Sequence, residues 1–454
     1  MLAPAPKLLR LTAIVVVPLA TLAGLFPDVA GLCVGAVVLF FLLAGIDALR
    51  ASGALAGLAV TLPLVVRLTR GQPGQVAVQL HNRTNCDRPV RLGLTLGPEL
   101  VSPEETRRLD LPIASVAVTL QWPVTATARG RFAITTAHVG TPSPFGLWEV
   151  RRAIPTACEV RSYPDLRAEQ RTAAAVFLSR GGTGSHALRQ VGKGREFEKL
   201  REYLPGDPAE DIHWRATAKR QHPVTKVFQL ERTQEVYLIL DASRLSARPA
   251  TTSAPDASAH PAAGPETVLD RCVSAALLLA AVAERQGDLF GVVAFDDQVR
   301  RFVRARSGRG HFAACRDALH HLQSRPVSPD FEDLCATLRL RLRRRALLVF
   351  LTALDDSVLA ESFTRGVDLL ARQHLVQVIQ PRPPGAEPVF TPDRPVNTGD
   401  DLYAALGGHL RWQRLRALEQ NLRRHNVRFA LSDHDALTSL IIRQYLDVKA
   451  RQLI

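Results

Sequence analysis

The chain has 454 residues, more than one ordinary domain holds, so we expect two or three domains. Its hydrophobic content of 46% is ample for buried cores, and its six cysteines form no C-x-x-C pair, a spacing that supports neither a zinc site nor a disulfide framework. A net charge of +14 indicates attraction to nucleic acid or to a lipid surface, or simply an arginine-rich composition that needs no ligand.

The N-terminal region is dominated by two uncharged apolar runs, residues 11–27 and 29–46. Each is near the lower limit of about 17–25 residues for a helix that crosses a membrane. Only Asp28 separates them, so the turn between them must be tight. We therefore expect residues 1–50 to form a transmembrane helical hairpin.

The charges that flank these runs predict an orientation. Lys7 and Arg10 precede the first run and Arg50 follows the second. The positive-inside rule then places both ends of the hairpin on the cytoplasmic side of the membrane, which we expect to be a bacterial inner (plasma) membrane. A signal peptide would also begin with two cations but would not need the second run. Residues 51–66 are uncharged too. Their β-branched residues and proline favour a strand, with a third span as the open alternative.

Residues 51–160 contain short runs in which apolar and polar residues alternate, separated by turn signals. This pattern is typical of a small antiparallel β-sandwich, in which Trp122 is expected to belong to the core.

From residue 236 to the C-terminus the pattern changes to apolar strands that alternate with helical segments. It predicts a doubly wound α/β domain, in which ligands bind beyond the carboxyl ends of the strands. Residues 247–265 are rich in Ala, Pro, Ser and Thr and predict a disordered insertion after the first strand. Residues 161–235 form a bridging segment between the two soluble domains.

Several motifs resemble parts of binding or catalytic sites, but each lacks a feature that such a site requires. The basic run 339–345 carries no interleaved aromatic and indicates a solvated helix end, so we expect no nucleic-acid partner. Residues 181–184 are glycine-rich but lack the GK[ST] ending of a phosphate loop. Cys315 and the nearby His311 have no arrangement that marks a nucleophile and its base. We expect no enzymatic activity.

The tip of the first α/β strand holds the best candidate for a site. Asp241-Ala242-Ser243 resembles the start of the metal-ion-dependent adhesion site of von Willebrand factor A domains, whose hard oxygen ligands suit Mg²⁺. Two ligand positions of that site are Leu245 and Ala353 here. The open alternatives are a degenerate site in which Asp241 caps a neighbouring helix, and a carboxylate site for phosphoryl chemistry formed by Asp241 with residues 355 and 356.

A charged segment before this strand resembles the signature of the bacterial family catalogued as domain of unknown function 58. Elements of the same family also match at residues 129–130, at residues 144–147 with Ser143 in place of Asp, and at Tyr445 and Lys449. The signature residues are Arg201, Glu202, Tyr203, Gly206, Asp207, Trp214, Arg215 and Ala218, followed by Lys226, Phe228 and Glu231.

The resemblance implies a membrane-tethered protein with a β-sandwich and a von Willebrand factor A-like domain, often encoded beside a MoxR-type AAA+ ATPase. We therefore expect a non-enzymatic interaction or assembly factor that serves as adaptor for such an ATPase. The alternative is a Mg-dependent ligand-binding module. The signature would be an internal brace between the soluble domains or a docking surface, and the apolar Tyr203, Ile212 and Trp214 favour a packed brace.

Overall fold

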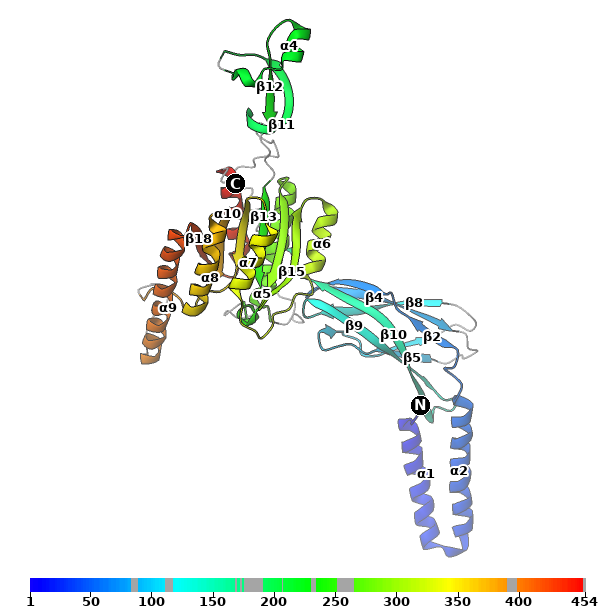
Figure 1. The fold of residues 1–454 in the computed structure, drawn as a ribbon. Helices are drawn as coiled ribbons and strands as arrows, with labels where there is room; N and C mark the ends of the chain where they lie inside the picture. The colour runs from blue at the N-terminus through cyan, green and yellow to red at the C-terminus, as the bar shows by residue number, and fades with distance from the viewer. Residues whose placement is uncertain are drawn as a thin grey trace. The chain divides into compact units, whose positions relative to one another are not determined.

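The structure is a computed structural model in which the chain forms two compact units (Figure 1). Met1–Asp165 belong to the first unit, and the described residues from Leu166 onward belong to the second. The described residues are 1–82, 89–110, 117–167, 170–171, 174, 191–205, 207–229, 234–250, 265–389 and 398–451. The predicted insertion therefore falls largely outside them, as do the glycine-rich residues 181–184 and the signature residues Gly206 and Glu231.

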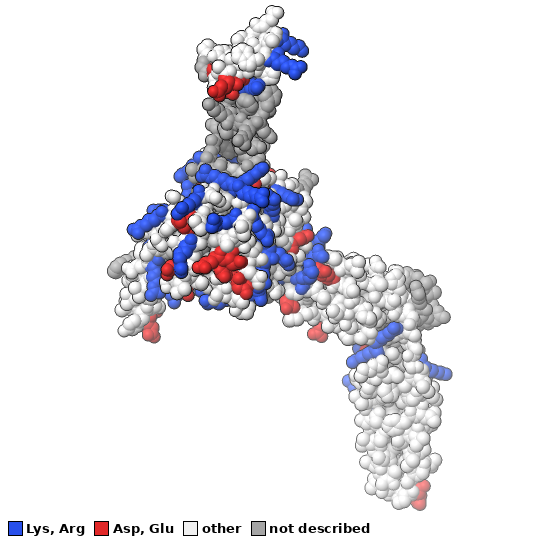
Figure 2. Space-filling view, viewed as in Figure 1, with Lys and Arg blue, Asp and Glu red and all other residues white. Residues whose placement is uncertain are grey.

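The first unit begins with two apolar helices, α1 (Pro6–Leu25) and α2 (Ala30–Ala51), joined by the short 3₁₀ helix η1 (Pro27–Val29). Both helices are long and apolar enough to cross a membrane, and few of their side chains are buried within the protein. Figure 2 shows their surface as almost free of charged residues. The predicted pair of apolar helices with a tight turn is confirmed.

The second helix is attached to the neighbouring sheet by a buried carboxylate. Asp47 has no exposed surface and accepts hydrogen bonds from the Ser143 hydroxyl and from the backbone N–H of Phe145, the latter at 3.1 Å. The Trp148 indole donates to the carbonyl of Ala44 at 2.8 Å. Ser143 stands where the family resemblance implies an aspartate, so α2 supplies the carboxylate that this turn binds.

Two sheets follow the helices and share one apolar core, as the layers of a β-sandwich do. Trp122 is fully buried between them, as predicted, and its indole donates to the Ser102 hydroxyl at 3.1 Å. Residues 58–61 and 65–69 are strands, so the expected strand character of this stretch is confirmed. One sheet contains β1 (Leu2–Pro4), β3 (Val65–Thr69), β5 (Pro89–Leu94), β7 (Arg107–Asp110), β9 (Gly130–Pro142) and β10 (Trp148–Tyr163), and the other contains β2 (Leu58–Thr61), β4 (Pro73–Asn82), β6 (Leu100–Val101) and β8 (Ala117–Ala126).

The second unit is built on a six-stranded sheet with the order β15-β14-β13-β16-β17-β18. All neighbouring strands are parallel except β15, which is antiparallel at one edge. The predicted alternation of apolar strands with helices describes the five parallel strands, but it did not include β15, whose sequence VRRFVRAR carries arginines on a half-exposed edge. The strands are β13 (Glu235–Asp241), β14 (Leu289–Phe295), β15 (Val299–Arg306), β16 (Ala346–Leu351), β17 (Leu375–Pro381) and β18 (Val427–Ser432).

Helices cover both faces of this sheet, because successive side chains of a strand point to opposite faces. Leu238 of β13 lies in a core with α5, α6 and α10, whereas its neighbours Tyr237 and Ile239 lie in a core with α7, α8 and α9. The helices are α5 (Val268–Arg285), α6 (Arg309–Leu319), α7 (Phe331–Arg341), α8 (Ser357–Ala371), α9 (Gly399–Arg424) and α10 (Leu437–Ala450).

The last helix is anchored to the sheet by a buried carboxylate at the start of β14. Asp288 accepts hydrogen bonds from the Tyr445 hydroxyl, from Lys449 Nζ at 2.8 Å and from the backbone N–H of Gln234 at 3.1 Å. Tyr445 and Lys449 are four residues apart on one face of α10, so the closing family element serves to bind Asp288. Burial and the Asp288 carboxylate raise the pKa of Tyr445.

We predict that Tyr445→Phe lowers the free energy of unfolding by about 1–3 kcal/mol, because Asp288 loses one donor in a dry site. Thermal or urea unfolding of the full-length protein in detergent measures this loss. Tyr403→Phe is the matched control, since Tyr403 is 75% exposed. Equal effects of the two substitutions would contradict the anchoring role.

Candidate functional site

The carboxyl ends of the parallel strands bring two distant polar residues together. Asp241 is the last residue of β13 and Thr352 follows β16. One carboxylate oxygen of Asp241 accepts from the backbone N–H of Ser243 at 2.8 Å, and the other accepts from the Thr352 hydroxyl at 2.6 Å. Asp241 and Ser243 thus lie together at the tip of β13, and their role as metal ligands stays a prediction. Thr352 was not predicted as their partner, although it ends the apolar run that forms β16.

The environment of Asp241 disfavours its charged form. Burial raises the pKa of this carboxyl, and the nearby Asp296 adds to the rise, whereas the hydrogen bonds from Ser243 and Thr352 oppose it. Removing a carboxylate from water disfavours its charged form. Asp241 therefore serves as a buried hydrogen-bond acceptor at the strand ends, where Ser243 and Thr352 donate to it.

The side chains at this tip do not supply the donor set that a magnesium ion needs. Leu245 and Ala353 stand at two of the ligand positions, and the Ser246 hydroxyl donates to the carbonyl of Ser243 at 2.9 Å. Both oxygens of Asp241 already accept hydrogen bonds. No group of three or more His, Cys, Asp or Glu side chains among the described residues could hold a metal ion.

A cavity of about 300 Å³ opens where the metal ligands would lie. Both apolar replacements, Leu245 and Ala353, line it. Two guanidinium groups also line it: Arg248 pairs with Asp355 at 2.9 Å, and Arg382 pairs with Asp433 at 3.0 Å. The remaining lining residues are Asp241, Ser246, Pro249, Val268, Cys272, Leu351, Thr352, Pro381, Pro383, Pro384 and His434.

The three carboxylates of the phosphoryl-transfer alternative have separate partners. Asp241 binds Ser243 and Thr352, and Asp355 binds Arg248. Asp356 caps α8 and accepts from the backbone N–H of Val358 at 2.8 Å. None of the three forms, with other described acidic, His or Cys side chains, a group that could hold a metal.

The family signature lies on a small hairpin of β11 (Val191–Glu202) and β12 (Val224–Gln229), with the short helix α4 (Trp214–Arg220) between them. Asp207 organises its turn. This carboxylate accepts from Arg201 at 2.6 Å, from the Leu204 backbone N–H at 3.0 Å and from the Thr225 hydroxyl at 3.3 Å. The Leu204 N–H and the Arg201 guanidinium hold the pKa of Asp207 below its usual value.

The expectation that Trp214 is packed is wrong, because its side chain is 69% exposed. A seven-residue helix beside a two-stranded sheet offers too small an interior to cover an indole. Arg215 and Ala218 are exposed as well, whereas Tyr203 and Ile212 are half-buried. The signature thus combines an internal polar network with an exposed aromatic side chain. Trp214 therefore does not support the interpretation of the signature as a packed brace.

Comparisons with known proteins identify a family for the central part of the chain. Residues 199–384 match the family described as "Protein of unknown function DUF58". No curated protein matches the chain.

Solved structures with some likeness include the conserved hypothetical protein BatB from Bacteroides thetaiotaomicron, at 13% identity over 48% of this chain and 99% of that chain, with a TM-score of 0.31. An uncharacterised membrane spanning protein from Vibrio fischeri matches at 13% identity over 48% of this chain and 98% of that one, with a TM-score of 0.18. Proximal thread matrix protein 1 from the mussel byssus matches at 13% identity over 48% of this chain, with a TM-score of 0.25, and only 46% of its own length is covered.

We predict that Asp241→Asn raises the melting temperature of the full-length protein at pH 7.5. The pKa of Asp241 is raised above its unfolded value of about 3.9, so ionisation favours the unfolded chain as the pH rises past that value. The gain should shrink as the pH falls towards 4. The exposed control Asp435→Asn should show no such dependence, and a less stable Asp241→Asn protein at pH 7.5 would contradict the assignment.

We also predict that millimolar Mg²⁺ leaves the melting temperature of the natural protein unchanged. The double substitution Leu245→Ser and Ala353→Asp should create a Mg²⁺-dependent rise of a few degrees, because it restores two hard oxygen ligands. Differential scanning fluorimetry with and without EDTA measures both. A rise in the natural protein that Asp241→Asn removes would instead establish a metal site.

Proposed function

Because residues 199–384 belong to the family described as protein of unknown function DUF58, we propose that this chain is a membrane-anchored, non-enzymatic interaction factor that assists the assembly of other proteins. The observation that carries the proposal is the apolar cavity at the carboxyl edge of the sheet, whose walls include Leu245 and Ala353. Ligands of open α/β sheets bind at this edge.

We propose that the second unit is related to von Willebrand factor A domains, because its strand order supports this relationship. A mainly parallel sheet with helices on both faces and one antiparallel edge strand places the ends of β13 and β16 at its centre. In this chain the edge would bind its partner without a metal.

The lining of the cavity indicates what kind of group it accepts. Its walls are mainly aliphatic, the guanidinium groups of Arg248 and Arg382 are each already paired with an aspartate, and burial raises the pKa of Asp241. His434 Nδ1 is buried and has no hydrogen-bond partner among the described residues. An apolar side chain of a partner protein matches this combination.

One cysteine and histidine pair among the described residues, Cys315 and His311, resembles a catalytic pair, and its geometry supports a non-enzymatic role. Cys315 Sγ lies 3.4 Å from His311 Nε2, but the same nitrogen is 2.7 Å from the carbonyl of Phe290 and must donate its proton there. Burial raises the pKa of Cys315 to about 12. This thiol therefore stays protonated, and His311 cannot act as its base.

The length and apolar surface of α1 and α2 support membrane anchoring through this helix pair. Lys7, Arg10 and Arg50 support a cytoplasmic location for both soluble units at the inner membrane. The family resemblance supports a MoxR-type AAA+ ATPase as the partner, reached from that side.

The test is co-purification of the full-length protein from detergent extracts with the MoxR-type ATPase of the same organism, in the presence of a slowly hydrolysed ATP analogue. Ala353→Phe should fill the cavity and lower recovery of the ATPase about tenfold, which corresponds to one buried anchor residue. Val358→Phe is the control, because Val358 is 72% exposed and lies outside the cavity.

Equal melting temperatures of the two variants would show that the fold is intact. Recovery of no AAA+ ATPase by the natural protein would overturn the adaptor role, and equal recovery by both variants would overturn the role of the cavity.

A further inference from the structure

Helix α9 has two apolar faces, and only one of them is covered by its own unit. Gly408, Leu415 and Leu422 are buried and recur every seven residues, so they form one stripe against the body of the unit. On the other side Leu406 and Leu410 are 43% and 55% exposed, and Tyr403 is 75% exposed. A surface helix normally has a single apolar stripe, so the second one calls for a partner.

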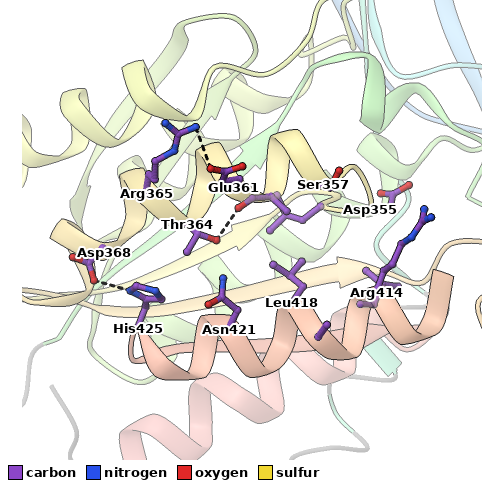
Figure 3. Close-up of a pocket in the computed structure, with 14 residues that line it drawn as sticks. Asp355, Ser357, Glu361, Thr364, Arg365, Asp368, Arg414, Leu418, Asn421 and His425 are labelled. Atoms are coloured by element: carbon purple, nitrogen blue, oxygen red, sulfur yellow. Dashed lines mark hydrogen bonds and ion pairs between the residues drawn. The ribbon is translucent and has the colours of Figure 1, made fainter. Parts of the chain in front are cut away.

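The exposed stripe lies on the half of the helix that has the fewest neighbours. From residue 399 to residue 414, Gly408 is the one buried residue. The C-terminal half instead faces α8 across a groove of about 600 Å³, where Leu418, Asn421 and His425 line the wall (Figure 3). An isolated helix of about fifteen residues is marginal in water, so contact with another helix would stabilise this half.

Two consecutive glycines in the middle of α9, Gly407 and Gly408, have different surroundings. A Cβ atom on Gly408 would lie 1.9 Å from the carbonyl oxygen of Gly385, so the packing of the unit requires glycine there. A Cβ atom on Gly407 would meet nothing within 4 Å. Glycine within a helix costs about 1 kcal/mol relative to alanine. Close approach of another backbone would account for Gly407, whereas its own unit does not.

The charges along the helix identify which partner fits. Asp400, Tyr403, Gly407, Leu410 and Arg414 alternate at spacings of three and four residues, the repeat of a helix that packs along another helix. Asp400 and Arg414, at the two ends of this stripe, form no ion pair with any described residue. Arg414 also lines the end of the groove that faces α8 (Figure 3). If a second copy of α9 lies antiparallel and centred on Gly407, each Asp400 meets the Arg414 of the other copy.

The same register also brings other residues of the N-terminal half of α9 opposite each other. Tyr403 comes opposite Arg411, a guanidinium that has no ion pair with a described residue and can stack on the ring. The two Gly407 residues face each other at the crossing point, and Leu406 and Leu410 flank it. Every contact occurs twice because the arrangement has two-fold symmetry.

We propose that the N-terminal half of α9 is a self-association surface, through which two copies of this chain pair antiparallel. One helix pair covers less area than a standard interface, so the dimer should be weak in dilute detergent. Tethering in a membrane raises the effective concentration and would favour it. The proposal does not depend on the cavity at the strand tips.

A charge exchange tests the register. Full-length protein in detergent is studied by analytical ultracentrifugation over a range of concentrations. Asp400→Arg and Arg414→Asp should each weaken the dimer about threefold to tenfold, because symmetry doubles the loss of one exposed ion pair. The double variant should regain the affinity of the natural protein. A monomeric natural protein, or a double variant weaker than both single variants, would overturn the proposal.

Disulfide trapping tests the orientation. The double variant Tyr403→Cys and Arg411→Cys should form a covalent dimer on mild oxidation, whereas Tyr403→Cys alone should not. The five described native cysteines are buried, so the natural protein is the background control. Efficient trapping by Tyr403→Cys alone would indicate parallel pairing and would contradict the antiparallel register.

Discussion

The geometry of the second unit depends on the parallel pairing of β13 with both β14 and β16. Because these strands run in one direction, their carboxyl ends lie at the same edge of the sheet. Asp241 thereby reaches Thr352 although 111 residues separate them. The strands can occupy the centre because every residue of β16 is buried and helices cover both faces. The carboxyl group of Asp241 is therefore buried at the end of β13. The cavity lies where the loops leave this edge of the sheet.

Two apolar residues decide what that edge can bind. Oxygen ligands at positions 245 and 353 would favour a cation, but Leu245 and Ala353 leave an aliphatic wall beside a carboxyl that favours its neutral form. Arg248 and Arg382 beside this wall are paired with aspartates, so their charges are balanced within the protein. The group that we propose the edge binds is therefore apolar.

The sequence predicts best where burial is uniform. The parallel strands are continuous apolar runs, so they could be recognised individually, whereas β15 alternates arginine with apolar residues on an exposed edge. Trp214 was misjudged because an aromatic residue in a charged motif indicates packing only if the local fold has an interior. The second stripe of α9 is hidden by the first, since opposed apolar faces weaken the periodicity of each. Asp288, Thr352 and the cavity depend on which distant segments meet, and no local pattern carries that information.

We propose that a partner protein docks at the carboxyl edge of the sheet and inserts an apolar group there. Hydrogen exchange of the full-length protein in detergent, with and without the ATP-bound MoxR-type ATPase, tests it most directly. We predict protection of backbone amides in residues 245–249, 351–354 and 382–386, where the loops line or border the cavity. Protection confined to the signature hairpin, residues 201–226, would contradict the account and would make the exposed Trp214 the centre of the interface.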